Sequence, residues 1–102
     1  MSLVKEGTTV VIGGKEYIAP ELPLRHVKRI LPEAKAQAEN PETDRGLELS
    51  LDIVSSALMK NYPEVTTDFL LDNSTFLEVQ QAAVQILEHS GFVSGKAVAV
   101  GP

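Results

Sequence analysis

The strongest helical pattern in this chain is the stretch Gly46-Leu-Glu-Leu-Ser-Leu-Asp-Ile-Val-Ser-Ser-Ala-Leu-Met-Lys-Asn-Tyr-Pro63. Its apolar residues recur every three or four positions, a spacing that places them on one side of a helix. We expect Asp44 to cap the start of this helix, and Pro63 to end it because a residue before proline disfavours helical conformation. The stripe predicts the most buried helix, and it consists of Leu47, Leu51, Val54 and Leu58, widened by Leu49 and Ile53.

A second helix is predicted between Thr75 and Gly91. Thr75 and Glu78 form a capping-box pattern, in which each side chain accepts a hydrogen bond from the backbone amide of the other residue. Gly91 favours the left-handed conformation that ends many helices, and Phe92 can fold back on the last turn. The expected apolar side of this helix consists of Phe76, Val79, Ala83, Ile86 and Leu87.

The N-terminal part of the chain predicts a β-hairpin at residues 8–18. Two β-rich runs flank Gly13-Gly14, a dipeptide typical of two-residue hairpin turns. An isolated hairpin is marginally stable in water. We therefore expect this hairpin to lie on the helices through Val11, Tyr17 or Ile18, or to pair with a strand of another chain.

The region between the hairpin and the leucine-rich stretch predicts an interrupted helix. Pro23 suits a first helical turn, and the apolar side comprises Leu24, Val27, Ile30 and Leu31. Pro32 removes an amide and clashes with the preceding turn, so we expect a break or kink before a second, alanine-rich piece at residues 32–39. Residues 40–45 are expected to form a polar loop, and Thr66 to cap a short turn over residues 68–71.

These elements predict a mainly α fold with an N-terminal β-hairpin (α+β). The expected domain is a small helical one of about four helical segments over residues 1–92. Residues 93–102 are expected to be a flexible tail, with one added strand as the alternative.

Composition limits the classes of function. The chain has 102 residues, no cysteine and a formal net charge of −5. The lack of cysteine excludes disulfides and thiolate catalysis, and the acidic balance argues against nucleic acid as a partner. No apolar run approaches the roughly 20 residues of a membrane helix, and no signal peptide is visible, so we expect a cytoplasmic protein with no membrane partner.

Charge is distributed unevenly along the chain. Residues 24–36 carry four basic side chains against Glu33, whereas residues 61–102 carry five acidic ones against Lys96. One interpretation is two solvated helix faces. The other is head-to-tail electrostatic matching between copies of the chain, or with a partner.

Residues that carry chemistry form no catalytic or metal-binding pattern. His26 and His89 lie far apart in the sequence and outside any known metal-binding spacing. The loop carboxylates Glu39, Glu42 and Asp44 lack the spacing of a calcium loop. We therefore predict no catalytic residue, no metal, no cofactor and no enzymatic activity.

Four segments of the chain resemble a known family: Ala19–Arg29, Ala57–Thr66, Leu70–Gln80 and Ser90-Gly91. Together they resemble tail assembly chaperones, small proteins encoded in the tail modules of tailed phages and prophages. The resemblance covers about residues 10–92. The chain departs from the family at Pro32 and in its valine-rich tail, so nothing is carried over to residues 93–102.

The resemblance implies a non-enzymatic role in phage tail assembly within the host cell. Such chaperones bind the long tape measure protein, shield its apolar helices, help to recruit tail tube subunits and are typically absent from the finished virion. A chaperone of helices needs an apolar groove with adjustable polar edges. Residues expected to bind a partner, or else to complete the core, are Leu49, Ile53, Met59, Phe69 and Leu77, and the hairpin edge is a second surface.

Two other functions stay open on the sequence. The chain could be a structural tail component that is retained in the virion. It could also be a small DNA-binding regulator that uses the basic helix around Arg25–Arg29, although the acidic balance opposes this.

The leucine-rich stretch generates a stability prediction. Leu51→Ala or Leu58→Ala should lower the free energy of unfolding by about 2–5 kcal/mol, because each change leaves a cavity in the core. Thermal or denaturant unfolding measures the loss. An unchanged thermal midpoint in both variants would mean that a different side of this helix is buried.

Overall fold

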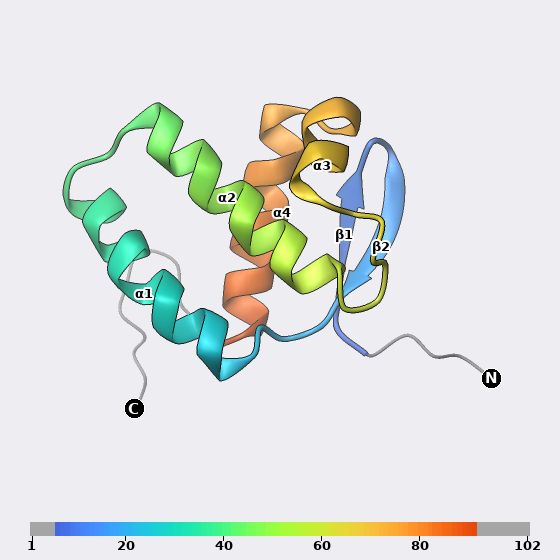
Figure 1. Ribbon diagram of the computed structural model, residues 1–102, viewed down its shortest axis with the longest axis horizontal. Coiled ribbons are helices and arrows are strands. Elements are labelled where there is room, and N and C mark those ends of the chain that lie inside the picture. The colour runs from blue at the N-terminus through green and yellow to red at the C-terminus, as the bar shows by residue number, and fades with distance from the viewer. Residues whose placement is uncertain (1–5, 92–102) are drawn as a thin grey trace.

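The computed structural model describes residues 6–91, which form a two-stranded antiparallel sheet and four helices (Figure 1). In Figure 1, α2 crosses in front of α4, with α1 at one side of the molecule and the hairpin at the other. This arrangement confirms the predicted mainly α class with an N-terminal hairpin. The elements are β1 (Thr8–Ile12), β2 (Lys15–Ala19), α1 (Leu24–Glu39), α2 (Thr43–Leu58), α3 (Thr67–Asn73) and α4 (Phe76–His89).

The core lies where α2 and α4 pack against each other and against one face of the hairpin. Helix α2 contributes the largest share, as predicted, and Leu51, Val54 and Leu58 of its stripe are buried, while Leu47 is half-buried and packs against the core. Helix α4 adds Val79, Ala82, Ala83 and Ile86, and the hairpin adds Val10, Ile12, Tyr17 and Ala19. Among the described residues, no helix is long and apolar enough to cross a membrane.

The hairpin has the predicted two-glycine turn. Gly13 and Gly14 have φ of 61° and 77°, the positive values that a type I′ turn requires at both central positions. A Cβ atom on Gly13 would lie 2.5 Å from the carbonyl oxygen of Asn73, so this position also needs glycine for close packing. The hairpin turn therefore packs against the end of α3, close to the start of α4.

The hairpin packs on the helices through one of the three residues expected to make this contact. Val10 pairs with Tyr17, and both point into the core, whereas Val11 is 44% exposed and Ile18 is only half-buried. Side chains alternate between the faces of a strand, so burying Val10 and Ile12 turns Val11 outward. The predicted contact through Tyr17 is confirmed, and that through Val11 is wrong.

Helix α4 begins with the predicted capping box. The Thr75 hydroxyl accepts from the Glu78 amide at 3.1 Å, and the Glu78 carboxylate accepts from the Thr75 amide at 3.0 Å. The same carboxylate also accepts from the amides of Gly13 at 3.0 Å and Gly14 at 3.2 Å. These hydrogen bonds, that of Gly13 first, lower the pKa of Glu78 below its ordinary value. One side chain therefore joins the start of α4 to the hairpin turn.

Both outer edges of the hairpin are bonded within the chain. On β2, the Ile18 amide donates to the Tyr62 hydroxyl at 3.1 Å, and the Asn61 amide group donates to the Ile18 carbonyl at 2.9 Å. On β1, Gln85 of α4 donates to the Thr9 carbonyl at 3.2 Å. A strand from another chain would have to displace these bonds, so the proposed alternative of strand addition is disfavoured here.

Helix α1 runs through Pro32 as one helix, so of the predicted break or kink the break is wrong. Pro32 leaves the Lys28 carbonyl without its helical donor. Both residues are exposed, so water can replace the missing hydrogen bond. The side of α1 that packs on the core is also narrower than predicted. Ile30 is buried and Val27 half-buried, but Leu24 and Leu31 face solvent.

Some predicted helix boundaries are shifted. Helix α2 begins at Thr43, so Asp44 lies in its first turn rather than at its cap, and it ends at Leu58, five residues before Pro63. Thr66 caps α3 as predicted, accepting from the Phe69 amide at 3.2 Å. Gly91 has the predicted positive φ, at 106°. The predictions for Phe92 and for residues 93–102 lie outside the described residues.

Phe76 is exposed, although it was predicted to lie on the apolar side of α4. Phe76 is the first residue of α4, so it lies at the end of the apolar side. There it lines a shallow hollow together with the exposed Leu71 of α3. Val79, Ala83 and Ile86 are buried as expected.

Replacing Glu78 with glutamine tests its link between α4 and the hairpin. The pKa of Glu78 is lower in the fold than its unfolded value of about 4.3. Its charge therefore stabilises the fold fully above that pH, and the stabilisation is lost as the pH falls through the lower folded value. We expect Glu78→Gln to melt at a lower temperature than wild type near neutral pH, with the difference vanishing at an acid pH below the folded pKa of Glu78.

Thermal unfolding by circular dichroism at both pH values measures this difference. Glu16→Gln, at an exposed position of β2, is the matched control and should leave the midpoint unchanged. A similar shift in the two variants would show that the carboxylate of Glu78 has no special role.

Candidate functional site: a groove between α2 and α4

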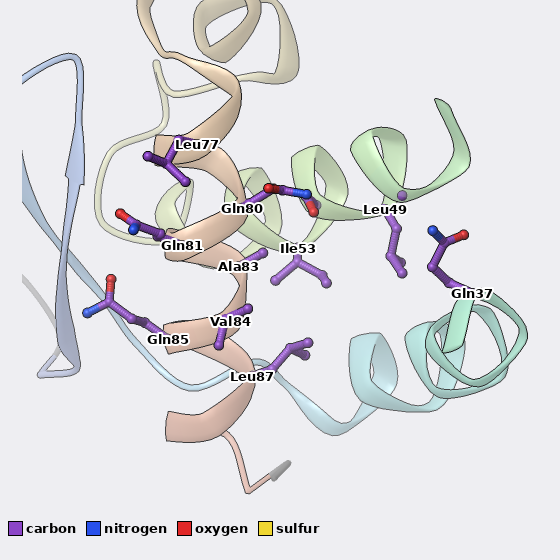
Figure 2. Close-up of a pocket in the computed structure, with 12 residues that line it drawn as sticks. Gln37, Leu49, Ile53, Leu77, Gln80, Gln81, Ala83, Val84, Gln85 and Leu87 are labelled. Carbon is purple, nitrogen blue, oxygen red and sulfur yellow. The ribbon is translucent and has the colours of Figure 1, made fainter. Parts of the chain in front are cut away.

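A groove of about 820 Å³ lies between α2 and α4 and extends to α1 (Figure 2). Figure 2 shows Ile53 of α2 and Leu87 of α4 directed into the space between the two helices. The residues that line it are Gln37, Gly46, Leu49, Ser50, Ile53, Leu77, Gln80, Gln81, Ala83, Val84, Gln85 and Leu87.

The groove has a buried floor and an exposed apolar rim. Ile53 and Ala83 are buried core residues and form the floor. Leu77 and Val84 are 60% and 44% exposed, and they lie seven residues apart on the same side of α4. The rim leucine and valine therefore retain apolar surface that a bound partner can cover.

None of the twelve residues that line the groove is charged, although 23% of the residues in the chain are. The polar groups are instead the hydroxyl of Ser50 and four glutamine amides, each of which can donate and accept hydrogen bonds. Gln80 and Gln81 are exposed on α4, between Leu77 and Val84 in the sequence. The surface is thus apolar with neutral, adaptable hydrogen-bonding groups.

Gln37 closes the α1 end of the groove. Its amide nitrogen donates to the Glu42 carbonyl at 2.8 Å, which ties α1 to the start of α2. A Cβ atom on Gly46 would lie 2.8 Å from that nitrogen, so the glycine allows the Gln37 side chain to approach α2 closely. The other amide atom of Gln37, Oε1, is buried and has no hydrogen-bond partner among the described residues.

The structure brings together three of the five residues predicted to bind a partner. Leu49, Ile53 and Leu77 line the groove, and Ile53 is also a core residue at 2% exposure. Met59 lies outside the groove, exposed just after the end of α2, and Phe69 is half-buried in α3 against the core.

Apart from Leu77, the groove residues on α4 were not predicted as partner-binding from the sequence. Leu77, Gln80, Gln81 and Val84 follow the spacing of one helix side, next to the side that carries Val79 and Ile86. This second stripe was detectable by its spacing. The stripe was not recognised because Gln80 and Gln81 interrupt its apolar pattern.

A group of charged residues ties α2 to α1. Asp52 pairs with Arg29 of α1 and accepts from the Ser56 hydroxyl at 3.2 Å. The hydrogen bond to Asp52 raises the pKa of Arg29, which stays charged in any case. Arg29 also lies 2.9 Å from Nδ1 of His26. Within residues 6–91, no three His, Cys, Asp or Glu side chains gather where they could hold a metal ion.

Comparison with known proteins identifies no relative. No protein-family model, curated protein or solved structure matches the chain.

Two alanine substitutions distinguish the floor of the groove from its rim. Ile53→Ala should lower the free energy of unfolding by about 2–5 kcal/mol, because it empties a buried site. Leu77→Ala should change it by no more than about 0.5 kcal/mol, since the side chain is largely exposed. Denaturant unfolding of both variants measures the contrast. A large loss from Leu77→Ala would show that the rim belongs to the core and is not free for a partner.

Proposed function

We propose that this chain is a tail assembly chaperone of a phage or prophage, which binds an apolar helical segment of the tape measure protein in the groove between α2 and α4. The observation that carries the proposal is the combination of exposed apolar side chains with a complete lack of charge along the groove. The resemblance of residues 10–92 to this class of protein supports the same role.

The neutral rim restricts the chemistry of the partner. A charged side chain that entered the groove would lose its hydration without meeting an opposite charge, which is unfavourable. Glutamine amides can instead match either donors or acceptors of the partner. The segment bound here should therefore present leucine-like and small neutral side chains, as an amphipathic helix does when it lies in a groove.

The size of the exposed rim favours reversible binding. Complete burial of a side chain such as Leu77 or Val84 contributes at most about 1.5–3 kcal/mol, and both are already partly covered. Association also loses translational, rotational and side-chain freedom. A transient complex of this kind suits a chaperone that releases the tape measure protein when tail tube subunits assemble around it in the host cell.

Co-expression with the tape measure protein encoded in the same tail operon tests the proposal. We expect the tagged wild-type chain to retain that protein on an affinity column, and Leu77→Asp/Val84→Asp to lose it, because each aspartate places an unpaired charge in the groove. Met59→Asp is the matched control, since Met59 is exposed but lies outside the groove. Retention unaffected by the double change, or no retention by wild type, would contradict the proposal.

The composition of purified virions separates a chaperone from a structural tail component. We expect mass spectrometry to find the chain absent or far below the abundance of the tail tube protein. A stoichiometric amount in finished particles would instead favour the structural role.

A further inference from the structure

Two exposed apolar surfaces remain outside the groove, and they lie on opposite parts of the molecule. One is on α1, where Leu24 is 79% exposed and Leu31 is also exposed. The other is formed by Leu71 of α3 and Phe76 of α4. Figure 1 shows α1 and α3 well separated, on opposite sides of α2. Neither surface is used by the proposed chaperone function.

The surface on α1 is a stripe of alternating leucine and lysine. Leu24, Lys28, Leu31 and Lys35 are spaced by four, three and four residues, so they share one side of the helix. All four side chains are exposed. The core contact of α1 is made by Ile30 on a different side.

The surface at α3 is an apolar hollow flanked by acid. It has a volume of about 180 Å³ and is lined by Leu47, Leu51, Leu70, Leu71, Ser74, Thr75, Phe76 and Val79. Asp68 and Asp72 are exposed and lie three and one residues from Leu71, a spacing that sets Asp68, Leu71 and Asp72 on one side of α3. The hollow is therefore mainly apolar, and the two carboxylates lie beside one of its lining residues, Leu71, on α3.

We propose that the Leu/Lys stripe of one copy of this chain docks on the acidic hollow of the next copy. Leu24 and Leu31 would cover the apolar side chains of the hollow, while Lys28 and Lys35 meet Asp68 and Asp72. The two surfaces are opposite in charge, and each exposes two large apolar side chains, which favours a second copy as the occupant.

The two surfaces differ, so the contact is heterologous: each copy uses its stripe on one neighbour and its hollow on another. Copies therefore join in a row or, if the rotation closes, in a ring. Docking of the stripe leaves the α1 end of the groove open, because Gln37 reaches the groove from another side of α1 than the stripe. Several grooves in succession would then be offered to one long helical partner.

The alternative occupant of the basic stripe is a nucleic acid. The net charge of −5 opposes this, because the rest of the chain repels phosphate. A nucleic acid is also negatively charged, so it would leave the acidic hollow without a partner. DNA binding by the isolated chain at physiological salt, without self-association, would overturn the proposal.

Sedimentation velocity across a range of protein concentrations tests the contact. We expect the mean mass of wild type to rise with concentration and this association to weaken in high salt, which screens exposed charges. Lys28→Glu/Lys35→Glu and Asp68→Lys/Asp72→Lys should each raise the concentration needed for association by at least about tenfold. A mixture of these two variants should associate again, because the reversed surfaces attract each other.

Two further variants separate the contact from effects of overall charge. Lys15→Glu/Lys60→Glu makes the same change in net charge as Lys28→Glu/Lys35→Glu, at two exposed positions outside α1, and should associate like wild type. Leu24→Ser should weaken association without loss of folding, since that side chain is almost fully exposed. A wild-type chain that stays monomeric at every concentration, or variants that all associate equally, would overturn the proposal. Neither result affects binding of the tape measure protein in the groove.

Discussion

The burial of α2 is the constraint on which the rest of the fold depends. This helix packs against α1, α3, α4 and β2, and six of its residues are buried. The chain has no tryptophan and no cysteine, so neither a large aromatic centre nor a disulfide can hold the elements together. Leucine, isoleucine, valine and alanine from α2 and α4 supply most of the apolar burial instead. The groove exists because α4 covers one side of α2 only partly, while α1 approaches from the other end.

Polar side chains fix the hairpin onto this helical core. Glu78 accepts hydrogen bonds from the turn, Asn61 and Tyr62 hold β2, and Gln85 donates to β1. The rings of Tyr17 and Tyr62 add an edge-to-face contact with centroids 5.0 Å apart. A two-stranded ribbon that is marginal by itself is stabilised here by apolar contact on one face and hydrogen bonds along both edges.

Local signals in the sequence were sufficient to predict which helices and strands form. They were not sufficient to predict which face of each element is buried. The capping box of Thr75 and Glu78 and the Gly13-Gly14 turn were predicted because each depends on residues close together in the chain. The uninterrupted path of α1 through Pro32 was not, because it depends on whether the neighbouring carbonyl meets water. The choice between Val10 and Val11 as the buried residue depends on where α4 lies. The groove likewise depends on how far apart α1, α2 and α4 lie, and the apolar pattern of one helix does not determine that distance.

The bonds between the hairpin and α4 have a consequence for biosynthesis. Gly13 and Glu78 are 65 positions apart, and Thr9 and Gln85 are 76 apart. The ribosome therefore makes the hairpin well before α4, the helix to which these bonds attach it. Contacts of such long range form slowly compared with local ones. The β1 edge and the turn of the nascent hairpin therefore cannot make these bonds until α4 has left the ribosome.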